Sequence, residues 1–300
     1  MAEQRIISLL PSATEILFAL GLDDQVLAVT HECDYPPAAL TKPHITRSLL
    51  RPDMTSGEID AAVRSQLTSD AHSLYTIDRD LLGAIQPDLI VTQQLCEVCA
   101  VDYDEVLDAI TILPKRPQVI TLEPNRLADV LRDIGTVGVA TDRAQAAEAL
   151  VADFEARIER VRLTVAQATT RPRVAFIEWI DPIFCGGHWN PELVAMAGGE
   201  DPIGRVGKRS EQVAWERVRA TQPEVMVVAA CGFTEQRARE DEPTLRAYPG
   251  FAELPCARSG RIHFVDGAAY FSRPGPRLVD SLELLARLIH PELFPATVSQ

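Results

Sequence analysis

Cysteine and histidine side chains are the residues of this sequence best suited to chemistry, because a thiolate or an imidazole can bind a metal ion or react as a nucleophile. Five of the six cysteines, all except Cys256, come directly after segments that have the composition of buried strands. One alternative is therefore a metal site or a thiol-redox site. Its candidate residues are His31, Cys33, Cys96, Cys99, Cys185 and Cys231.

A second interpretation of the same cysteines is that they are core residues, since a free cysteine behaves as a small buried hydrophobe. Their spacing lacks the second close pair of a zinc ribbon. Cys96 and Cys99 are spaced as CxxC after a strand, where a dithiol would have a lowered pKa. The sequence contains no GxSxG, Walker, GxGxxG or HExxH motif, which favours a binding protein over an enzyme.

Short β-rich runs alternate with helical runs along the chain, which is typical of a parallel sheet covered by helices. In such sheets, ligands bind outside the carboxyl ends of the strands. The segments after the predicted strands, where the cysteines lie, are therefore the expected site. The predicted strands are residues 5–10, 26–30, 89–92, 118–122, 174–179, 225–230 and 262–265.

One long helix is expected between two such lobes, because residues 142–169 contain neither Gly nor Pro and repeat apolar residues at helical spacing. The predicted fold class is α/β, with two Rossmann-like lobes of parallel strands joined by one long rigid helix and a ligand cleft between the lobes. The predicted domains are an N-terminal lobe (1–140, with a helical insert at about 52–75), the connecting helix (141–170) and a C-terminal lobe (171–300).

The two lobes share a local pattern, which suggests a duplication. Residues 81–91 and residues 215–227 each read as a helix that ends in Gln, Pro and an acidic residue, followed by a buried strand.

Composition and charge exclude some partners. Of 300 residues, 46% are hydrophobic, and 43 acidic against 29 basic side chains give a net charge of −14. Such a surface repels phosphate backbones, so no nucleic acid is expected as a partner. No apolar run approaches the length of a membrane span, so the chain is not expected to cross a membrane.

The first ten residues contain only a short apolar run, broken by Pro11, which fits a first strand better than a secretory signal. The sequence as written predicts a cytoplasmic protein. A periplasmic or extracytoplasmic location is expected if a leader has been trimmed.

Several segments, in order, resemble the substrate-binding proteins of ABC importers for vitamin B12 and ferric siderophores, with most similarity to the cobalamin-binding branch. The resemblance spans essentially the whole chain and implies the bilobed fold, capture of a large metal chelate between the lobes, and delivery to a permease. The segments are residues 9–16 (LLPSATEI), 34–37 (DYPP), 85–90 (IQPDLI), 181–187 (DPIFCGG), 198–201 (GGED) and 273–277 (RPGPR).

The resemblance also implies ligand contacts in the strand-end segments. Glu32, Gln93 and Ser210 stand where the vitamin B12 binders have aromatic residues, so other aromatic side chains are expected to form the walls that a corrinoid needs. The predicted ligand-binding residues are Pro11, Ser12, Glu32, Tyr35, Gln93, Phe184, His188, Trp189, Ser210, Phe233, Tyr270 and Phe271. Asp80 and Glu216 are the carboxylates expected to dock on permease arginines.

The sequence thus predicts a protein that captures a corrinoid (cobalamin-like) or other metal-chelate ligand for transport or intracellular handover. No covalent cofactor is expected, and a bound metal ion belongs to the Cys/His alternative. An ABC permease is the candidate protein partner. Replacing Trp189 or Phe184 by Ala is expected to weaken ligand binding without unfolding the protein.

Overall fold

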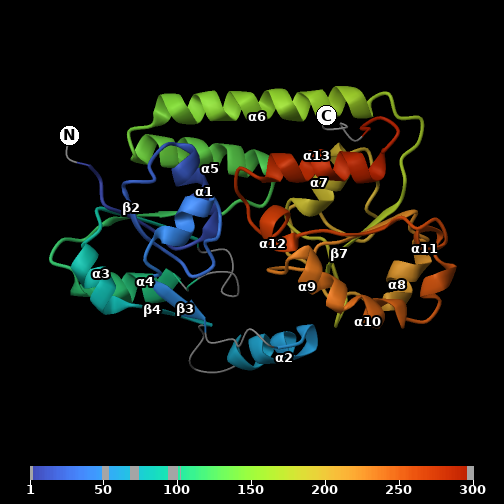
Figure 1. The fold of residues 1–300 in the computed structure, drawn as a ribbon, viewed down its shortest axis with the longest axis horizontal. Helices are drawn as coiled ribbons and strands as arrows, with labels where there is room; N and C mark the ends of the chain where they lie inside the picture. Colours follow the sequence, from blue (N-terminus) through green and yellow to red (C-terminus); the bar gives the residue numbers. More distant parts are fainter. Residues whose placement is uncertain (1–2, 49–53, 68–73, 94–100, 102, 296–300) are drawn as a thin grey trace. The chain divides into compact units, whose positions relative to one another are not determined.

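The computed structural model describes residues 3–48, 54–67, 74–93, 101 and 103–295. The chain divides into two compact units: residues 1–123 with 131–150 form unit 1, and residues 124–130 with 151–300 form unit 2. Each unit contains a four-stranded sheet, built mainly of parallel strands and accompanied by helices (Figure 1). The predicted α/β class with two parallel-stranded lobes is confirmed.

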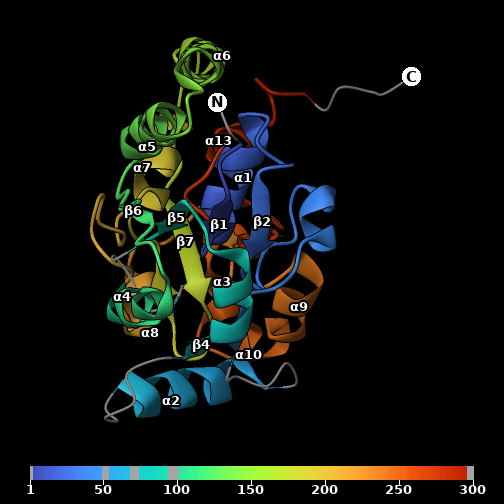
Figure 2. The same cartoon turned by 90° about the vertical axis from the view of Figure 1, so that its left-hand side faces the viewer.

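The main sheet of unit 1 is entirely parallel, with strand order β2-β1-β5-β6. Figure 2 shows these strands side by side. The inner strands β1 and β5 are fully buried, as expected for apolar, β-branched runs in a parallel sheet. The strands are β1 (Ile6–Ser8), β2 (Val26–Val29), β5 (Leu89–Thr92) and β6 (Gln118–Thr121).

The helices of unit 1 precede or follow these strands. They are α1 (Pro11–Ala19), α3 (Arg79–Ile85) and α4 (Tyr103–Ala109), with 3₁₀ turns at Pro37–Thr41 and Ile110–Ile112. The predicted helical insert contains α2 (Ser56–Leu67). It lies between β3 (Thr46–Ser48) and β4 (Tyr75–Ile77), an antiparallel pair that the sequence did not predict.

The main sheet of unit 2 has strand order β10-β9-β7-β8, in which only β8 is antiparallel. The strands are β7 (Val174–Trp179), β8 (Phe184–Cys185), β9 (Val225–Val228) and β10 (Ile262–Phe264). The helical segments are α7 (Asn190–Met196), α8 (Trp215–Ala220), α9 (Glu235–Glu240), α10 (Glu242–Arg246), a 3₁₀ turn (Phe251–Glu253), α11 (Pro255–Arg258), α12 (Gly267–Tyr270) and α13 (Leu278–Ile289).

Both faces of the unit 2 sheet are buried, because successive side chains of a strand point to opposite faces. Val174 and Phe176 of β7 belong to the apolar cluster that includes residues of α7 and α13. Ala175 and Ile177 belong to a second cluster with residues of α8 and α11. This explains why β7 and β9 are nearly continuous apolar runs rather than alternating ones.

The repeated Gln-Pro pattern has a structural counterpart in both units. Gln86 follows α3 with a φ of 49°, and Gln222 follows α8 with a φ of 47°. Each left-handed residue ends its helix and turns the chain into an inner strand, β5 or β9. The similarity found in the sequence therefore extends to the backbone.

Two helices belong partly to each unit. α5 (Leu127–Ala140) begins in unit 2 and continues in unit 1, whereas α6 (Ala144–Val165) begins in unit 1 and continues in unit 2. α6 is 22 residues long and corresponds to the connecting helix predicted at 142–169. Within unit 1, a Cβ on Gly138 of α5 would lie 2.5 Å from the Cβ of Ala147, so this glycine permits close packing against α6.

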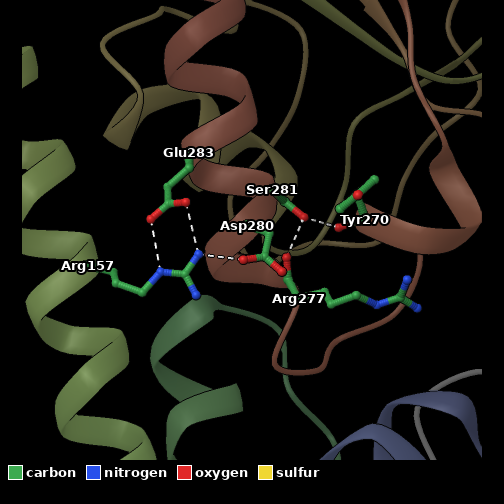
Figure 3. Close-up of polar contacts among 6 residues, drawn as sticks. All are labelled: Arg157, Tyr270, Arg277, Asp280, Ser281 and Glu283. Carbon is green, nitrogen blue, oxygen red and sulfur yellow. Dashed lines mark hydrogen bonds and ion pairs between the residues drawn. The ribbon is translucent and has the colours of Figure 1, made fainter. Parts of the chain in front are cut away.

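In unit 2, an arginine fork fastens α6 to α13. Arg157 donates from Nε and Nη2 to the two carboxylate oxygens of Glu283, each at 2.9 Å, and from Nη2 to Asp280 (Figure 3). These hydrogen bonds raise the pKa of the guanidinium above its ordinary value. On the next residue of α13, Ser281 donates to the carbonyl oxygen of Tyr270 and thereby ties α12 to α13.

Removing this fork should measurably destabilise the protein. We expect Arg157→Met to lower the free energy of unfolding by about 1–2 kcal/mol, since a bidentate, partly buried ion pair exceeds the usual surface pair. Arg162→Met on the same helix is the control, because the Arg162–Glu159 pair is exposed. Urea unfolding followed by circular dichroism measures both, and equal effects would contradict the assigned role.

Candidate ligand-binding site

The predicted ligand residues of unit 1 follow the carboxyl ends of its strands. Pro11 and Ser12 open α1 directly after β1, with Pro11 partly buried and Ser12 buried. Glu32 and Tyr35 follow β2 and are exposed, and Gln93 follows β5 and is buried. These residues thus lie at the edge of the sheet where open parallel folds bind ligands.

A network of buried side-chain hydrogen bonds lies next to this edge of the sheet. Thr14 of α1 donates to Ser8 Oγ at 2.8 Å, and its Oγ1 lies 3.0 Å from the Sγ of Cys33. All three side chains are almost completely buried. In unit 1, Cys33 is therefore a packed core thiol.

The ring of His31 is held in place at the end of β2. Its Nδ1 lies 2.7 Å from Thr46 Oγ1, which in turn donates to Thr30 Oγ1 at 2.9 Å. The ring packs against Tyr75 with centroids 5.3 Å apart, and Nε2 lies 3.4 Å from the carboxylate of Glu32. The imidazole is thus oriented by its neighbours.

In unit 2, the β8–α7 loop (residues 186–189) pairs with a second segment, residues 207–212. The His188 N–H donates to the Lys208 carbonyl at 2.5 Å, and the Gly207 N–H donates to the His188 carbonyl at 2.8 Å. His188 has a left-handed φ of 49°. Burial, followed by the charge of Arg209, lowers the pKa of its imidazole, so the ring is neutral near pH 7.

A carboxylate at the end of β7 joins the two segments. Glu178 Oε1 accepts hydrogen bonds from the Gly187 N–H and from Nδ2 of Asn190, both at 2.7 Å. The Ser210 side chain is a third hydrogen-bond partner. Burial raises the pKa of the Glu178 carboxyl, although these three hydrogen bonds act in the opposite direction.

Asp201 is a second acidic group close to this loop. Its Oδ1 accepts the N–H groups of Ile203 at 3.0 Å and Gly204 at 2.9 Å, while Oδ2 is buried and accepts no hydrogen bond from any described residue. Burial, with a smaller contribution from the charge of Glu178, raises the pKa of Asp201 to about 6, although the two hydrogen bonds and Arg217 act in the opposite direction.

The predicted aromatic walls fall into two groups. Trp189 is 6% exposed and Phe271 is 1% exposed, and both belong to the core of unit 2. The Phe271 ring packs against that of Phe176 with centroids 5.2 Å apart, and the role of both residues in ligand binding stays a prediction. Phe184, Phe233 and Tyr270 are only partly buried.

Phe233 is held by its neighbours. Its ring lies 4.9 Å from that of Trp179 and 4.3 Å below the guanidinium carbon of Arg237. Such a cation–π contact is attractive and stabilises the packing of the ring.

The cysteines that the structure describes do not form part of a metal-binding group. Cys33 and Cys185 are buried in different units, Cys231 is exposed, and Cys96 and Cys99 lie outside the described residues. Within the described ranges, no group of three or more His, Cys, Asp or Glu side chains could hold a metal ion.

The exposure of the thiols predicts their reactivity. We expect iodoacetamide at pH 8 to alkylate Cys231 at least tenfold faster than Cys256, because burial of Cys256 raises its pKa to about 11. Peptide mass spectrometry of the labelled protein measures both rates. Equal labelling of the folded protein would show that Cys256 is accessible.

The predicted docking acids occupy equivalent positions. Asp80 is in the first turn of α3 and Glu216 is in the first turn of α8, and both are exposed. These are the two helices that end in the Gln-Pro pattern. Their role in docking stays a prediction.

Glu178, Asn190 and Asp201 are not among the residues predicted from the sequence. One signal was present for Glu178: a carboxylate close to the end of an otherwise apolar six-residue strand. Such a group needs partners, which here come from a loop whose path the sequence does not reveal.

Comparisons with known proteins agree with this architecture. A vitamin B12-binding protein of Vibrio cholerae serotype O1 is 26% identical over 290 residues, covering 93% of this chain and 87% of that protein. A vitamin B12-binding protein of Vibrio parahaemolyticus serotype O3:K6 is 24% identical over 283 residues, covering 93% of this chain and 86% of that protein.

Solved structures with the same fold include two periplasmic binding proteins. The periplasmic heme-binding protein from Roseiflexus sp. RS-1 matches with a TM-score of 0.72 and 23% identity, covering 97% of this chain and 100% of that chain. The periplasmic vitamin B12 binding protein of Vibrio cholerae matches with a TM-score of 0.70 and 21% identity, covering 97% and 98%.

Two lobes with parallel sheets, each presenting loops at its strand ends, define the class of bilobed binding proteins. The model of the periplasmic binding protein family matches residues 6–269, and the chain belongs to this family. The resemblance described from the sequence is thereby confirmed. Among the described residues, no helix is both long enough and apolar enough to span a bilayer.

Proposed function

We propose that this protein binds a tetrapyrrole-type metal chelate, a corrinoid or a heme, and passes it to an ABC permease. The similarity to vitamin B12-binding proteins over 93% of the chain is the observation that supports this most strongly. The solved neighbours that bind heme or vitamin B12 point to the same ligand class. Binding rather than catalysis is the activity that this family membership supports.

The strand-end residues of both units fit this ligand class. In unit 1 they offer Pro11, Glu32 and Gln93, and in unit 2 they offer the partly buried rings of Phe184 and Tyr270. A planar chelate has apolar faces and a polar rim, so apolar walls with few polar groups suit it. We propose that these strand-end residues contact the ligand.

Permease docking through Asp80 and Glu216 is the second part of the proposal. Each carboxylate is exposed at the start of a helix in its own unit, which suits recognition by an arginine. The family's description also supports a periplasmic location. Cell fractionation with an antibody against the protein would test this location.

A binding titration tests the ligand. The protein is mixed with hydroxocobalamin or with hemin, separated by gel filtration, and the visible spectrum of the protein peak is recorded. We expect one chelate per chain, and a shifted spectrum if a side chain binds the metal. A colourless protein peak with both compounds would contradict the proposal.

A matched pair of variants relates this binding to the proposed site. We expect Phe184→Ala to weaken the affinity about tenfold by removing a partly buried ring. Val139→Ala, which changes a residue of α5 that is 71% exposed, is the control and should bind as the wild type does.

A further inference from the structure

In the described part of unit 2, Glu178 of β7 is hydrogen-bonded to two loop segments that are far apart in the sequence. It stands near the end of β7 and is hydrogen-bonded to Gly187 in the β8–α7 loop, to Asn190 at the start of α7, and to Ser210. Its own carbonyl oxygen accepts the N–H of Cys231 at 3.0 Å, at the end of β9. A single residue thus connects two strand ends with both loop segments.

The two loop segments pack closely against each other next to this carboxylate. A Cβ on Gly187 would lie 2.2 Å from the backbone nitrogen of Ser210, so only glycine allows this approach. The Cys185 N–H donates to the Glu211 carbonyl at 3.0 Å, which extends the pairing of the segments beyond His188. The backbone positions of His188 and Ser210 are therefore set jointly.

The side chains next to Glu178 indicate that this anchor serves more than packing. His188 Nε2 and Asn190 Oδ1 are buried and have no hydrogen-bond partner among the described residues. Buried polar atoms without partners are unusual in folded proteins and call for an explanation. The Nε2 of His188, in a loop whose backbone pairs with the segment that carries Ser210, is a group that a ligand can use.

We infer that Glu178 is a positioning residue, which holds His188 and Ser210 in the arrangement that contacts the metal chelate. The inference rests on the proposed function for the identity of the ligand. It assigns to the carboxylate a role in affinity through Gly187, Asn190 and Ser210, without contact between Glu178 and the chelate.

Two substitutions separate this role from general stabilisation. Glu178→Ala removes all three hydrogen bonds, whereas Glu178→Gln retains an oxygen that can accept from Gly187 and Asn190, and Ser210 can accept from the new amide. We expect Glu178→Ala to weaken binding of hydroxocobalamin or hemin at least tenfold, and Glu178→Gln to stay within about threefold of the wild type.

A ligand-free measurement accompanies the titrations. Amide hydrogen exchange of peptides covering residues 183–190 and 206–212 should speed up at least tenfold in Glu178→Ala and little in Glu178→Gln. Glu192→Gln is the matched control. Glu192 lies in the first turn of α7 and, like Glu178, accepts a hydrogen bond from a backbone N–H, that of Leu127 at 2.9 Å. It should leave both the exchange and the affinity unchanged.

The outcomes separate the two proposals. Unchanged exchange in Glu178→Ala, or equal affinity of Glu178→Ala and wild type, overturns the positioning role. A wild type that binds neither hydroxocobalamin nor hemin overturns the proposed function, and the exchange data then decide whether Glu178 anchors the loops. If Glu178→Ala does not fold, the test depends on the folded Glu178→Gln variant. Binding by this variant at least tenfold weaker than that of the wild type would contradict rescue by the retained acceptor and overturn the inference.

Discussion

Trp189→Ala is expected to lower the free energy of unfolding by about 3–5 kcal/mol, the largest effect of any substitution considered. The indole ring is 6% exposed and lies in the apolar cluster of unit 2. Its Nε1 donates to the carbonyl oxygen of Phe271 at 2.9 Å. Truncation would leave both a cavity and a buried carbonyl without this donor.

This expectation revises the one based on sequence, in which Trp189→Ala weakened ligand binding and left the fold intact. Urea unfolding monitored by circular dichroism would measure the loss. Phe184→Ala is the comparison, since its ring is only partly buried and should cost about 1–2 kcal/mol. A Trp189→Ala variant as stable as Phe184→Ala would show that the indole is not a core residue.

The wild type should lose about 3 kcal/mol of its free energy of unfolding as the pH rises through the pKa of Asp201, and Asp201→Asn should abolish this loss. Burial raises the pKa of this carboxyl from 3.8 to about 6 on folding. A raised pKa means that the folded state binds the proton more tightly. The stability gained from this is fully present below pH 3.8 and is lost as the pH rises through about 6.

The amide introduced by the Asp201→Asn substitution keeps an oxygen for the N–H groups of Ile203 and Gly204 and carries no charge. We therefore expect the variant to exceed the wild type in stability at pH 7.5 and to match it near pH 4. Urea unfolding across this range measures the difference, with Asp153→Asn on the exposed face of α6 as the control. Parallel pH profiles for wild type and Asp201→Asn would contradict the assigned burial.

The sequence was informative wherever local pattern determines structure. Apolar runs gave the inner strands, a stretch without Gly or Pro gave α6, and the Gln-Pro repeat gave two helix ends with the same left-handed residue. The edge of the sheet at which the candidate residues lie followed from strand polarity alone.

Properties that depend on tertiary packing could not be predicted in the same way. Phe184 and Trp189 lie close to the same glycine pair in the sequence. Only the path of the loop decides that the Trp189 ring is in the core and the Phe184 ring is partly buried. The partners of Glu178 are 9, 12 and 32 residues away in the sequence, at positions with no local signal. The β3–β4 pair was missed because three-residue strands carry too little pattern.

The division of α5 between the units has a practical consequence for anyone who wishes to express one lobe alone. Leu127 and Val130 come early in the chain, yet they are core residues of unit 2. A recombinant fragment that starts at residue 141 or 171 would lack them and expose the apolar surface they cover. Dissection of this protein into autonomous halves therefore calls for a permuted gene, in which the segment 124–130 is reattached to the second half, rather than a single cut.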